Sequence, residues 1–253
     1  MTDEHRSLIG HSIDPVETEY YERVSDSWWD PNGKLWPLHR LNQLRITYLR
    51  DQISKTFPSS IDRALPLKGL TILDVGCGGG LLCEPLALLG AKVTGIDVVA
   101  RNVAVAKRHA QIQPDLVIDY RVQTAEALCR TKARFDIVLS MEVVEHVSDL
   151  QGFSDSCAEL VRPGGFIGFA TINRTLKSYV FAILGAEYIL GWLPRGTHRW
   201  RKFVHPNSLE SILSRKGFTV SDRRGIAINP LNRHFRLTSS LAVNFMLTAR
   251  RES

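Results

Sequence analysis

A cluster of glycines after an apolar stretch constrains the fold more than any other feature of the chain. Residues Leu70 to Val75 have the composition of a β-strand, and four of the five residues 76–80 are glycine. A helix-like segment then begins at Leu81. A tight turn between a strand and a helix needs positive φ angles and lets a ligand approach the backbone without a Cβ in the way. The pattern predicts the first half of a nucleotide-binding β-α-β unit.

The ligand class follows from the acidic residues around these glycines. A second apolar run ends at Asp97, and a carboxylate at a strand tip suits the two hydroxyls of a ribose. A dinucleotide fingerprint that starts at Gly76 requires Gly or Ala where Leu81 stands. Asp74 precedes the glycines, which disfavours a pyrophosphate and favours a cationic ligand. S-adenosylmethionine (SAM) carries a sulfonium and an ammonium, and the stretch DVGCGGG resembles the first motif of the class I methyltransferases.

Strand-like and helix-like segments alternate along the chain, which predicts an α/β fold with a doubly wound, seven-stranded, mostly parallel sheet of Rossmann type. Ligands of such sheets bind beyond the carboxyl ends of the strands. We expect residues 1–57 to be an N-terminal extension that closes over the cofactor, and residues 58–253 to be the cofactor-binding domain. Strands are expected at 70–75, 92–96, 117–122, 135–140, 166–171, 218–223 and 241–249, and helices at 99–111, 149–161 and 206–216.

The extension is rich in aromatic residues between positions 20 and 36, and apolar residues then recur at helical spacing from 41 to 49. That expected helix carries Arg45. In one interpretation the helix is part of a lid, and the planar guanidinium of Arg45 binds the cofactor carboxylate. In the other, the helix packs on the sheet and Arg45 is solvated. The spacing alone slightly favours the second interpretation.

A group of titratable residues follows the fourth expected strand. Glu142, Glu145 and His146 stand at i, i+3 and i+4, which places them on one face if the segment is helical. Two carboxylates and an imidazole suit Mg²⁺, Mn²⁺ or Zn²⁺. Alternatively, Glu142 is a first-turn acid favoured by the helix dipole, and His146 is a hydrogen-bonded spacer or a general base. Met141 is expected to lie against the adenine as an adaptable apolar surface.

Residues 175–205 form an expected insertion with a strongly apolar core. From Ser178 to Leu193, twelve of sixteen residues are apolar, which is too short a run to span a bilayer. Tryptophan residues such as Trp192 are common at the interface between lipid headgroups and the membrane interior. Five basic or histidine residues follow between positions 195 and 202. This combination favours an element that lies on an anionic membrane surface. The alternative is a core helix that covers the sheet.

The bulk composition is that of an ordinary globular protein, with 44% hydrophobic and 23% charged residues among 253. The N-terminus does not resemble a signal peptide, and the four cysteines lack a metal-binding spacing, so we expect a cytoplasmic protein with reduced thiols. Residues 1–30 carry eight acids and two bases, a net charge of −6, whereas the rest carries +12. The positive charge of residues 31–253 favours an anionic binding partner. The alternative is that these basic residues form an ordinary solvated surface.

Together these residues resemble the ubiquinone biosynthesis O-methyltransferases over nearly the whole chain from about Glu17 to Arg250. The matching stretches include LDVGCGGGLL and SMEVVEHV, which occur across many methyltransferases. Far narrower are the Trp-Trp segment WWDPNGKLWPLHRLNQLR and the series TINRTLKS, GAEYIL and PRGTH. The resemblance implies methylation of phenol or catechol hydroxyls on polyprenylated precursors at two steps of that pathway. It implies peripheral association with membranes, and we expect other enzymes of the pathway as partners. It also implies SAM binding by Arg45, Gly76, Asp97 and Met141, and a divalent cation, expected to be Mg²⁺, at Glu142, Glu145 and His146.

Three other classes are compatible with parts of the pattern. A nucleic-acid methyltransferase acting on exocyclic nitrogen is expected to carry a (D/N)PP(Y/F)-like element after the fourth strand, where SMEV stands, so we expect no nucleic-acid partner. A dehydrogenase linked to NAD is disfavoured by Asp74 and Leu81. A non-catalytic cofactor-binding or membrane adaptor protein predicts binding without turnover.

Overall fold

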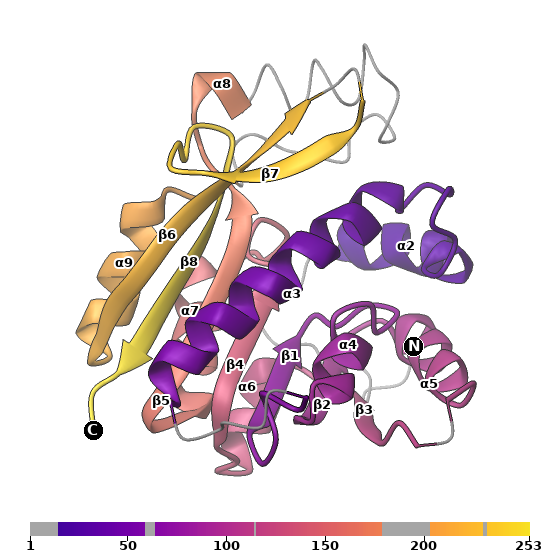
Figure 1. Ribbon diagram of the computed structural model, residues 1–253, viewed down its shortest axis with the longest axis horizontal. Coiled ribbons are helices and arrows are strands. Elements are labelled where there is room, and N and C mark those ends of the chain that lie inside the picture. Colours follow the sequence, from indigo (N-terminus) through magenta and orange to yellow (C-terminus); the bar gives the residue numbers. More distant parts are fainter. Residues whose placement is uncertain (1–14, 59–63, 114, 179–202, 230–231) are drawn as a thin grey trace.

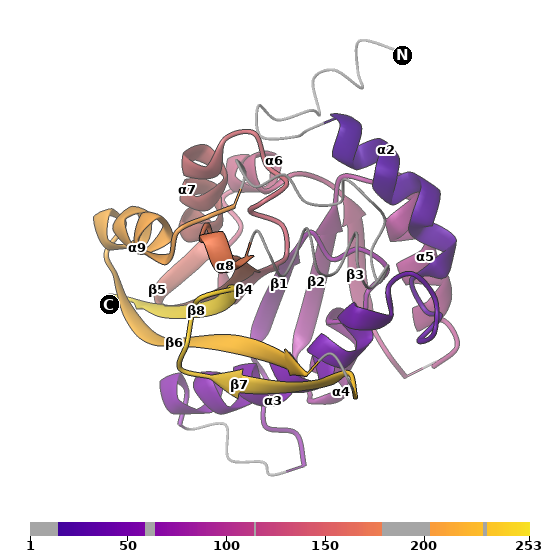
Figure 2. The ribbon, with the colours of Figure 1, turned by 90° about the horizontal axis from the view of Figure 1, so that it is seen from above.

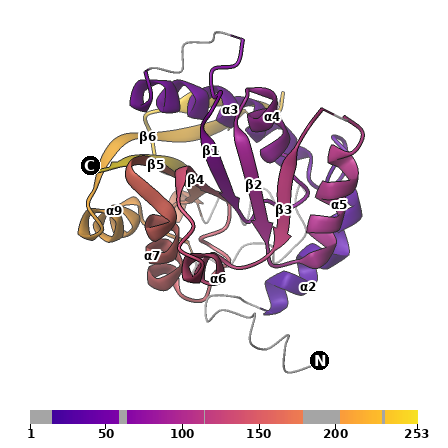
Figure 3. The same cartoon turned by 90° about the horizontal axis from the view of Figure 1, so that it is seen from below.

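The computed structural model describes residues 15–58, 64–113, 115–178, 203–229 and 232–253 (Figure 1). Its centre is one sheet with the strand order β3-β2-β1-β4-β5-β8-β6-β7, in which β1 to β5 are parallel and β8 runs antiparallel to β5 and β6. Figure 3 shows β3, β2, β1 and β4 side by side. The strands are β1 Thr71–Val75, β2 Lys92–Asp97, β3 Ile118–Val122, β4 Phe135–Met141, β5 Val161–Ile172, β6 Phe218–Asn229, β7 His234–Thr238 and β8 Asn244–Arg251.

Helices cover both faces of the sheet, as expected for a doubly wound fold (Figure 2). Neighbouring strand residues point to opposite faces: Ile72 packs with α3, α4 and α5, whereas Leu73 packs with α6, α7 and α9. The expected α/β class is therefore confirmed. The helices of eight or more residues are α2 Pro15–Val24, α3 Trp36–Thr56, α5 Ala100–Ala110, α7 Leu150–Leu160 and α9 Pro206–Arg215; the shorter ones are η1 Ser25–Ser27, α4 Cys83–Leu88, α6 Ala125–Arg130 and α8 Leu176–Ser178.

The carboxyl-terminal part of the sheet differs from the expectation of seven strands. The described residues form eight strands, because β6 continues to Asn229 and pairs with an additional strand, β7, as a hairpin. The aromatic ring of Phe235 in this hairpin meets Trp36 at the start of α3 edge to face, with ring centroids 6.2 Å apart. Burial of that aromatic contact holds the hairpin against α3.

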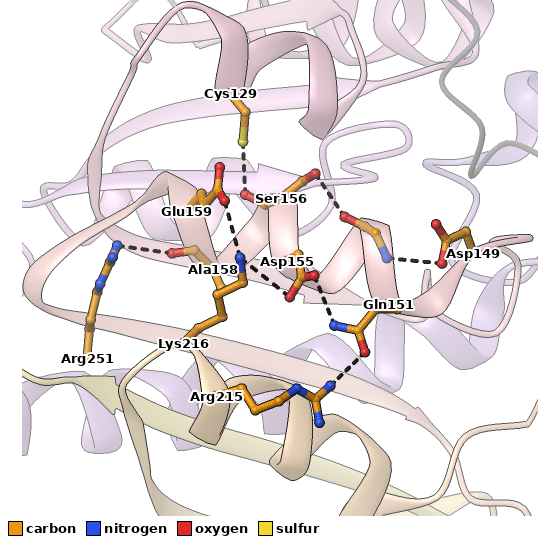
Figure 4. Close-up of polar contacts among 11 residues, drawn as sticks. Cys129, Asp149, Gln151, Asp155, Ser156, Ala158, Glu159, Arg215, Lys216 and Arg251 are labelled. Carbon is orange, nitrogen blue, oxygen red and sulfur yellow. Dashed lines mark hydrogen bonds and ion pairs between the residues drawn. The ribbon is translucent and has the colours of Figure 1, made fainter.

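Polar contacts join α7 and α9 on the face away from α3 (Figure 4). Asp149 caps α7 by accepting a hydrogen bond from the Gly152 amide at 3.0 Å. Arg215 donates to Gln151, and the Lys216 ammonium lies 3.3 Å from the Glu159 carboxylate. Pairs of this kind at a surface contribute little stability each, so the apolar contacts beneath them carry most of the packing energy.

Candidate active site

A cavity of about 190 Å³ opens beyond the carboxyl ends of the parallel strands. The segments that follow β1, β2, β3 and β4 line it, together with residues of α2 and α3. The strand-end residues predicted from the sequence therefore meet at one place. All four expected cofactor-binding residues line this cavity, and so do two of the three expected metal ligands, Glu142 and His146. Its lining includes Arg45, Asp74, Gly76, Asp97, Ala125, Glu126, Met141, Glu142 and His146.

The glycine loop after β1 adopts the backbone conformation that its sequence requires. Gly76, Gly78 and Gly80 have φ angles of 77°, 53° and 89°. A Cβ added at Gly78 would meet the Trp28 ring at 2.4 Å. The loop therefore needs glycine both for its dihedral angles and for the indole that lies against it.

Asp97 is buried at the tip of β2 and held in one orientation by its neighbours. Its Oδ2 accepts a hydrogen bond from the Gly78 amide at 2.9 Å, and its Oδ1 accepts one from the Val99 amide at 2.8 Å. Burial raises the pKa of Asp97, and these amide donors oppose that shift. The carboxylate is thus fixed beside the glycine loop, at the edge of the cavity.

A second buried carboxyl group, Asp74, lies at the end of β1. It is 3% exposed, and the Cys83 thiol donates a hydrogen bond to its Oδ2 at 3.2 Å. Burial raises the pKa of Asp74 to about 7. A group with this pKa titrates near neutrality, so a cation bound beside it would favour the ionised form.

Arg45 is only 2% exposed, so the expectation that it is solvated is wrong. The other part of that interpretation is confirmed, because α3 packs on the sheet. The Arg45 guanidinium forms an ion pair with Glu142 across the cavity wall, and its Nε is buried with no hydrogen-bond partner among the described residues. Glu142 itself has a φ of 58°, a conformation that a non-glycine residue rarely adopts. The contact between α3 and the end of β4 is therefore polar and strained.

The residues after β4 do not form the expected helix. Met141 ends the strand, and a turn closed by the His146 amide and the Val143 carbonyl at 2.8 Å follows, while α7 begins only at Leu150. The expectation that Glu142, Glu145 and His146 share a helical face is wrong. The positive φ of Glu142 breaks the helical path before a first turn can form.

The three expected metal ligands also have different partners. Glu142 pairs with Arg45; the Oε2 of Glu145 accepts a hydrogen bond from Thr171 at 2.6 Å; and the Nε2 of His146 lies 3.3 Å from the Tyr21 hydroxyl. Burial, and then the Glu142 carboxylate, raise the pKa of Glu145 to about 7. In the part of the chain that the structure describes, no three His, Cys, Asp or Glu side chains are arranged to hold a metal ion. As arranged here, these residues do not fit a metal.

Residues 15–35, called here the N-terminal segment, lie over the glycine loop and beside α5 (Figures 2 and 3). The Trp29 indole donates to the Gly79 carbonyl at 2.9 Å and stacks on His109 with ring centroids 3.4 Å apart. Trp28 is 7% exposed and packs on the loop. Among the aromatic residues of positions 20 to 36, Tyr21 and Trp28 therefore line the cavity.

Asn102 lines the cavity but was not predicted from the sequence. It is a buried polar residue inside α5, five residues after Asp97. Tyr21 was predicted only as part of the aromatic cluster, and its contact with His146 was not predicted because the two residues are 125 positions apart.

The insertion lies largely at residues 179–202, outside the described residues. Within the described ranges, none of the helices combines the length and the apolar character that crossing a membrane requires.

Comparison with known protein families and solved structures identifies the class of protein to which the chain belongs. Residues 42–222 match the family model of a methyltransferase domain. The structure of magnesium protoporphyrin IX methyltransferase from Synechocystis with bound S-adenosylhomocysteine (SAH) superposes with a TM-score of 0.67 at 19% identity, covering 94% of this chain and 99% of that chain. That likeness shows a shared fold. The chain is a methyltransferase-domain protein.

Sequence relatives narrow the class further. A ubiquinone biosynthesis O-methyltransferase from Chelativorans sp. (strain BNC1) is 49% identical over 238 residues, which is 94% of each chain. One from Rhizobium leguminosarum bv. trifolii (strain WSM2304) is 47% identical over 253 residues, covering 100% of this chain and 98% of the relative. The chain belongs to the family of ubiquinone biosynthesis O-methyltransferases, as the resemblance in its sequence predicted.

Proposed function

We propose that this protein is a SAM-dependent O-methyltransferase that methylates phenol or catechol hydroxyls of polyprenylated ubiquinone precursors, at both O-methylation steps. The observation that carries the proposal is the charge arrangement of the cavity. Two buried carboxyl groups, Asp74 and Asp97, and one buried guanidinium, Arg45, surround a turn of glycines. A ligand with hydroxyls, an ammonium and a carboxylate complements all three.

Each part of SAM has a proposed partner. Asp97 accepts hydrogen bonds from the ribose hydroxyls, and Asp74 faces the ammonium. Arg45 binds the carboxylate with donors that include its Nε, for which the described residues offer no other partner. Gly76 lets the ligand approach the backbone, and Met141 lies against the adenine. The ion pair between Arg45 and Glu142 opens in part when the cofactor carboxylate arrives.

Methyl transfer from a sulfonium is an in-line displacement without a covalent enzyme intermediate. The protein contributes by aligning the oxygen, the methyl carbon and the sulfur, an effect that can supply several kcal/mol. A phenol titrates near pH 10, so the nucleophile is scarce at neutral pH. His146 is our candidate base, because it lies in the cavity wall and its Nε2 is within reach of the Tyr21 hydroxyl.

Mg²⁺ remains a prediction from the family resemblance. It would lower the pKa of a bound catechol, but binding requires Glu142 and His146 to leave the partners they have here. The measurement is turnover of a short-tailed catechol analogue with labelled SAM, with and without EDTA. If Glu142, Glu145 and His146 rearrange around the ion, EDTA reduces turnover at least about tenfold and added Mg²⁺ restores it.

The same assay separates the alternatives. Unchanged turnover in EDTA would show that the reaction needs no divalent cation, and His146 would then be the proposed base. Activity on RNA or DNA with none on the catechol would identify a nucleic-acid methyltransferase instead. SAH binding without turnover on the catechol or on nucleic acid would favour another small-molecule methyltransferase or a non-catalytic protein.

Cofactor binding should depend on pH through Asp74. Burial raises the pKa of free Asp74 to about 7, and the ammonium of bound SAH lowers it, so binding releases a proton below pH 7. We expect the SAH association constant to fall about tenfold per pH unit below pH 7 and to be constant above it. Calorimetry from about pH 5.5 to about pH 8.5 measures this dependence. Asp74→Asn is the control; if it keeps the full pH dependence, another group is responsible.

We also propose that the protein is cytoplasmic and associates peripherally with anionic membranes through residues 175–205, which reach a substrate whose tail lies in lipid. The apolar run and its basic flank support this proposal. Trp192→Glu is expected to reduce co-sedimentation with anionic vesicles at least about fivefold, whereas Trp192→Phe retains it. Unchanged co-sedimentation of the glutamate variant would refute the role of this segment. Association with other enzymes of the pathway remains a prediction.

A further inference from the structure

Asn102 connects two parts of the site that are far apart in sequence. It lies on α5, is 1% exposed, and stands between Asp97 on one side and the N-terminal segment on the other. A buried amide of this kind is costly unless its polar atoms are hydrogen-bonded. Its hydrogen bonds therefore show what it holds in place.

The two ends of the amide have different partners. The Oδ1 of Asn102 accepts a hydrogen bond from the Trp28 indole Nε1 at 2.8 Å. It also lies 2.7 Å from the Ser25 hydroxyl, whose single proton is shared with the Tyr21 carbonyl at 2.7 Å. The Nδ2 of Asn102 donates to the Oδ1 of Asp97 at 3.4 Å. The amide oxygen thus faces the N-terminal segment, and the amide nitrogen faces the proposed ribose acceptor.

Trp28 also covers the glycine loop that faces the cofactor cavity. Its ring occupies the space that a Cβ would need at Gly78 and Gly79. If the N-terminal segment moved away, the glycine loop would lose this cover and the Oδ1 of Asn102 would lose both partners. The amide would then be free to rotate and would no longer hold its nitrogen toward Asp97.

We propose that Asn102 is a positioning residue that couples closure of the N-terminal segment to cofactor binding at Asp97. The coupling is reciprocal: closure keeps the Asn102 amide as a third donor to Asp97, beside the two backbone amides that already fix this carboxylate, and bound cofactor favours the closed segment. This inference rests on the proposed function, since it assumes that SAM and SAH bind at Asp97. It adds to that function a residue that touches neither the methyl group nor the acceptor oxygen.

The test compares two substitutions that break the same connection from opposite sides. Trp28→Phe keeps an aromatic ring on the glycine loop but removes the donor to Asn102, and Asn102→Ala removes the amide. SAH affinity is measured by calorimetry for the wild type, both single variants and the double variant. We expect each single variant to weaken binding about three- to tenfold, and the double variant to be no weaker than the worse single variant. The KM for SAM should rise by the same factor while kcat changes less than about twofold.

Trypsin cleavage after Arg23 reports closure independently, because Arg23 is exposed while the next residue, Val24, is buried. Saturating SAH should slow this cleavage about fivefold or more in the wild type and much less in Asn102→Ala, whose folding is checked by thermal unfolding. If Asn102→Ala does not fold, Trp28→Phe alone must show the lower affinity and the reduced protection.

The outcomes separate this inference from the proposed function. The coupling is refuted if the losses of SAH affinity in the two single variants multiply in the double variant. It is also refuted if SAH protects the wild type and the variants from trypsin equally. In both cases SAH binding itself, and with it the proposed function, is unaffected. If the wild-type protein does not bind SAH at all, the proposed function fails first.

Discussion

Asp97→Asn is expected to weaken SAH binding by about a hundredfold, because it removes the charged acceptor of two ribose hydroxyls. Hydrogen bonds to a charged group are worth about 1.5–3 kcal/mol each, and the neutral amide offers only one acceptor oxygen. The substitution also affects the protein. Asp97 accepts hydrogen bonds from the amides of Gly78 and Val99, and an asparagine must turn its NH₂ group toward one of these donors. The glycine loop then loses part of its support as well.

Calorimetric titration with SAH at about pH 8 measures the effect, and Asp136→Asn is a matched control. Asp136 is also a buried carboxylate of the sheet, and its Oδ2 accepts two hydrogen bonds from Thr71, both at 2.7 Å. It lies near the start of β4, at the opposite edge from the cavity. We expect Asp136→Asn to lower the free energy of unfolding and to leave SAH affinity within about twofold. Equal losses of affinity in both variants would mean that Asp97 acts through stability alone.

The sequence was most informative where a chemical requirement is local. Glycines at positive φ after a strand, and a carboxylate at the tip of the next strand, predicted the order β1-α4-β2 and the place of the cavity. Continuous apolar runs predicted the buried parallel strands such as β4. Each of these patterns lies within a few consecutive residues, so it can be recognised from the sequence alone.

The features of the fold and of the site that the sequence did not predict depend on contacts between segments that are distant in the chain. The spacing of Glu142 and His146 is the same in a helix and in a turn, and the ion pair of Glu142 with Arg45, 97 residues earlier in the chain, was invisible in the sequence. The burial of Arg45 likewise follows from the packing of α3, since helical periodicity places a residue on a face but not in a cavity. The hairpin partner β7 was missed because its half-buried residues mix arginine with apolar side chains.

Gly80→Ala is expected to lower the free energy of unfolding by about 3 kcal/mol, through backbone strain and a clash within the core. Gly80 has a φ of 89°, and an added Cβ would lie 2.3 Å from the Tyr120 hydroxyl. Tyr120 is 3% exposed and packed in the core, so its ring has little room to withdraw. Urea unfolding monitored by circular dichroism measures the change.

Two further variants divide this loss into its causes. Gly69→Ala introduces a Cβ at a similar φ of 83° with no heavy atom within 4 Å, so it should cost only about 1 kcal/mol of backbone strain. Tyr120→Phe removes the hydroxyl, which is buried without a hydrogen-bond partner in the described part of the chain, and should raise stability by about 1 kcal/mol. Combined with Gly80→Ala it should recover at least about 1 kcal/mol beyond additivity, because the ring carbon then lies 3.0 Å from the new methyl group. Strict additivity would show that the Tyr120 hydroxyl does not restrict the glycine loop, and strain alone would account for the glycine at this position.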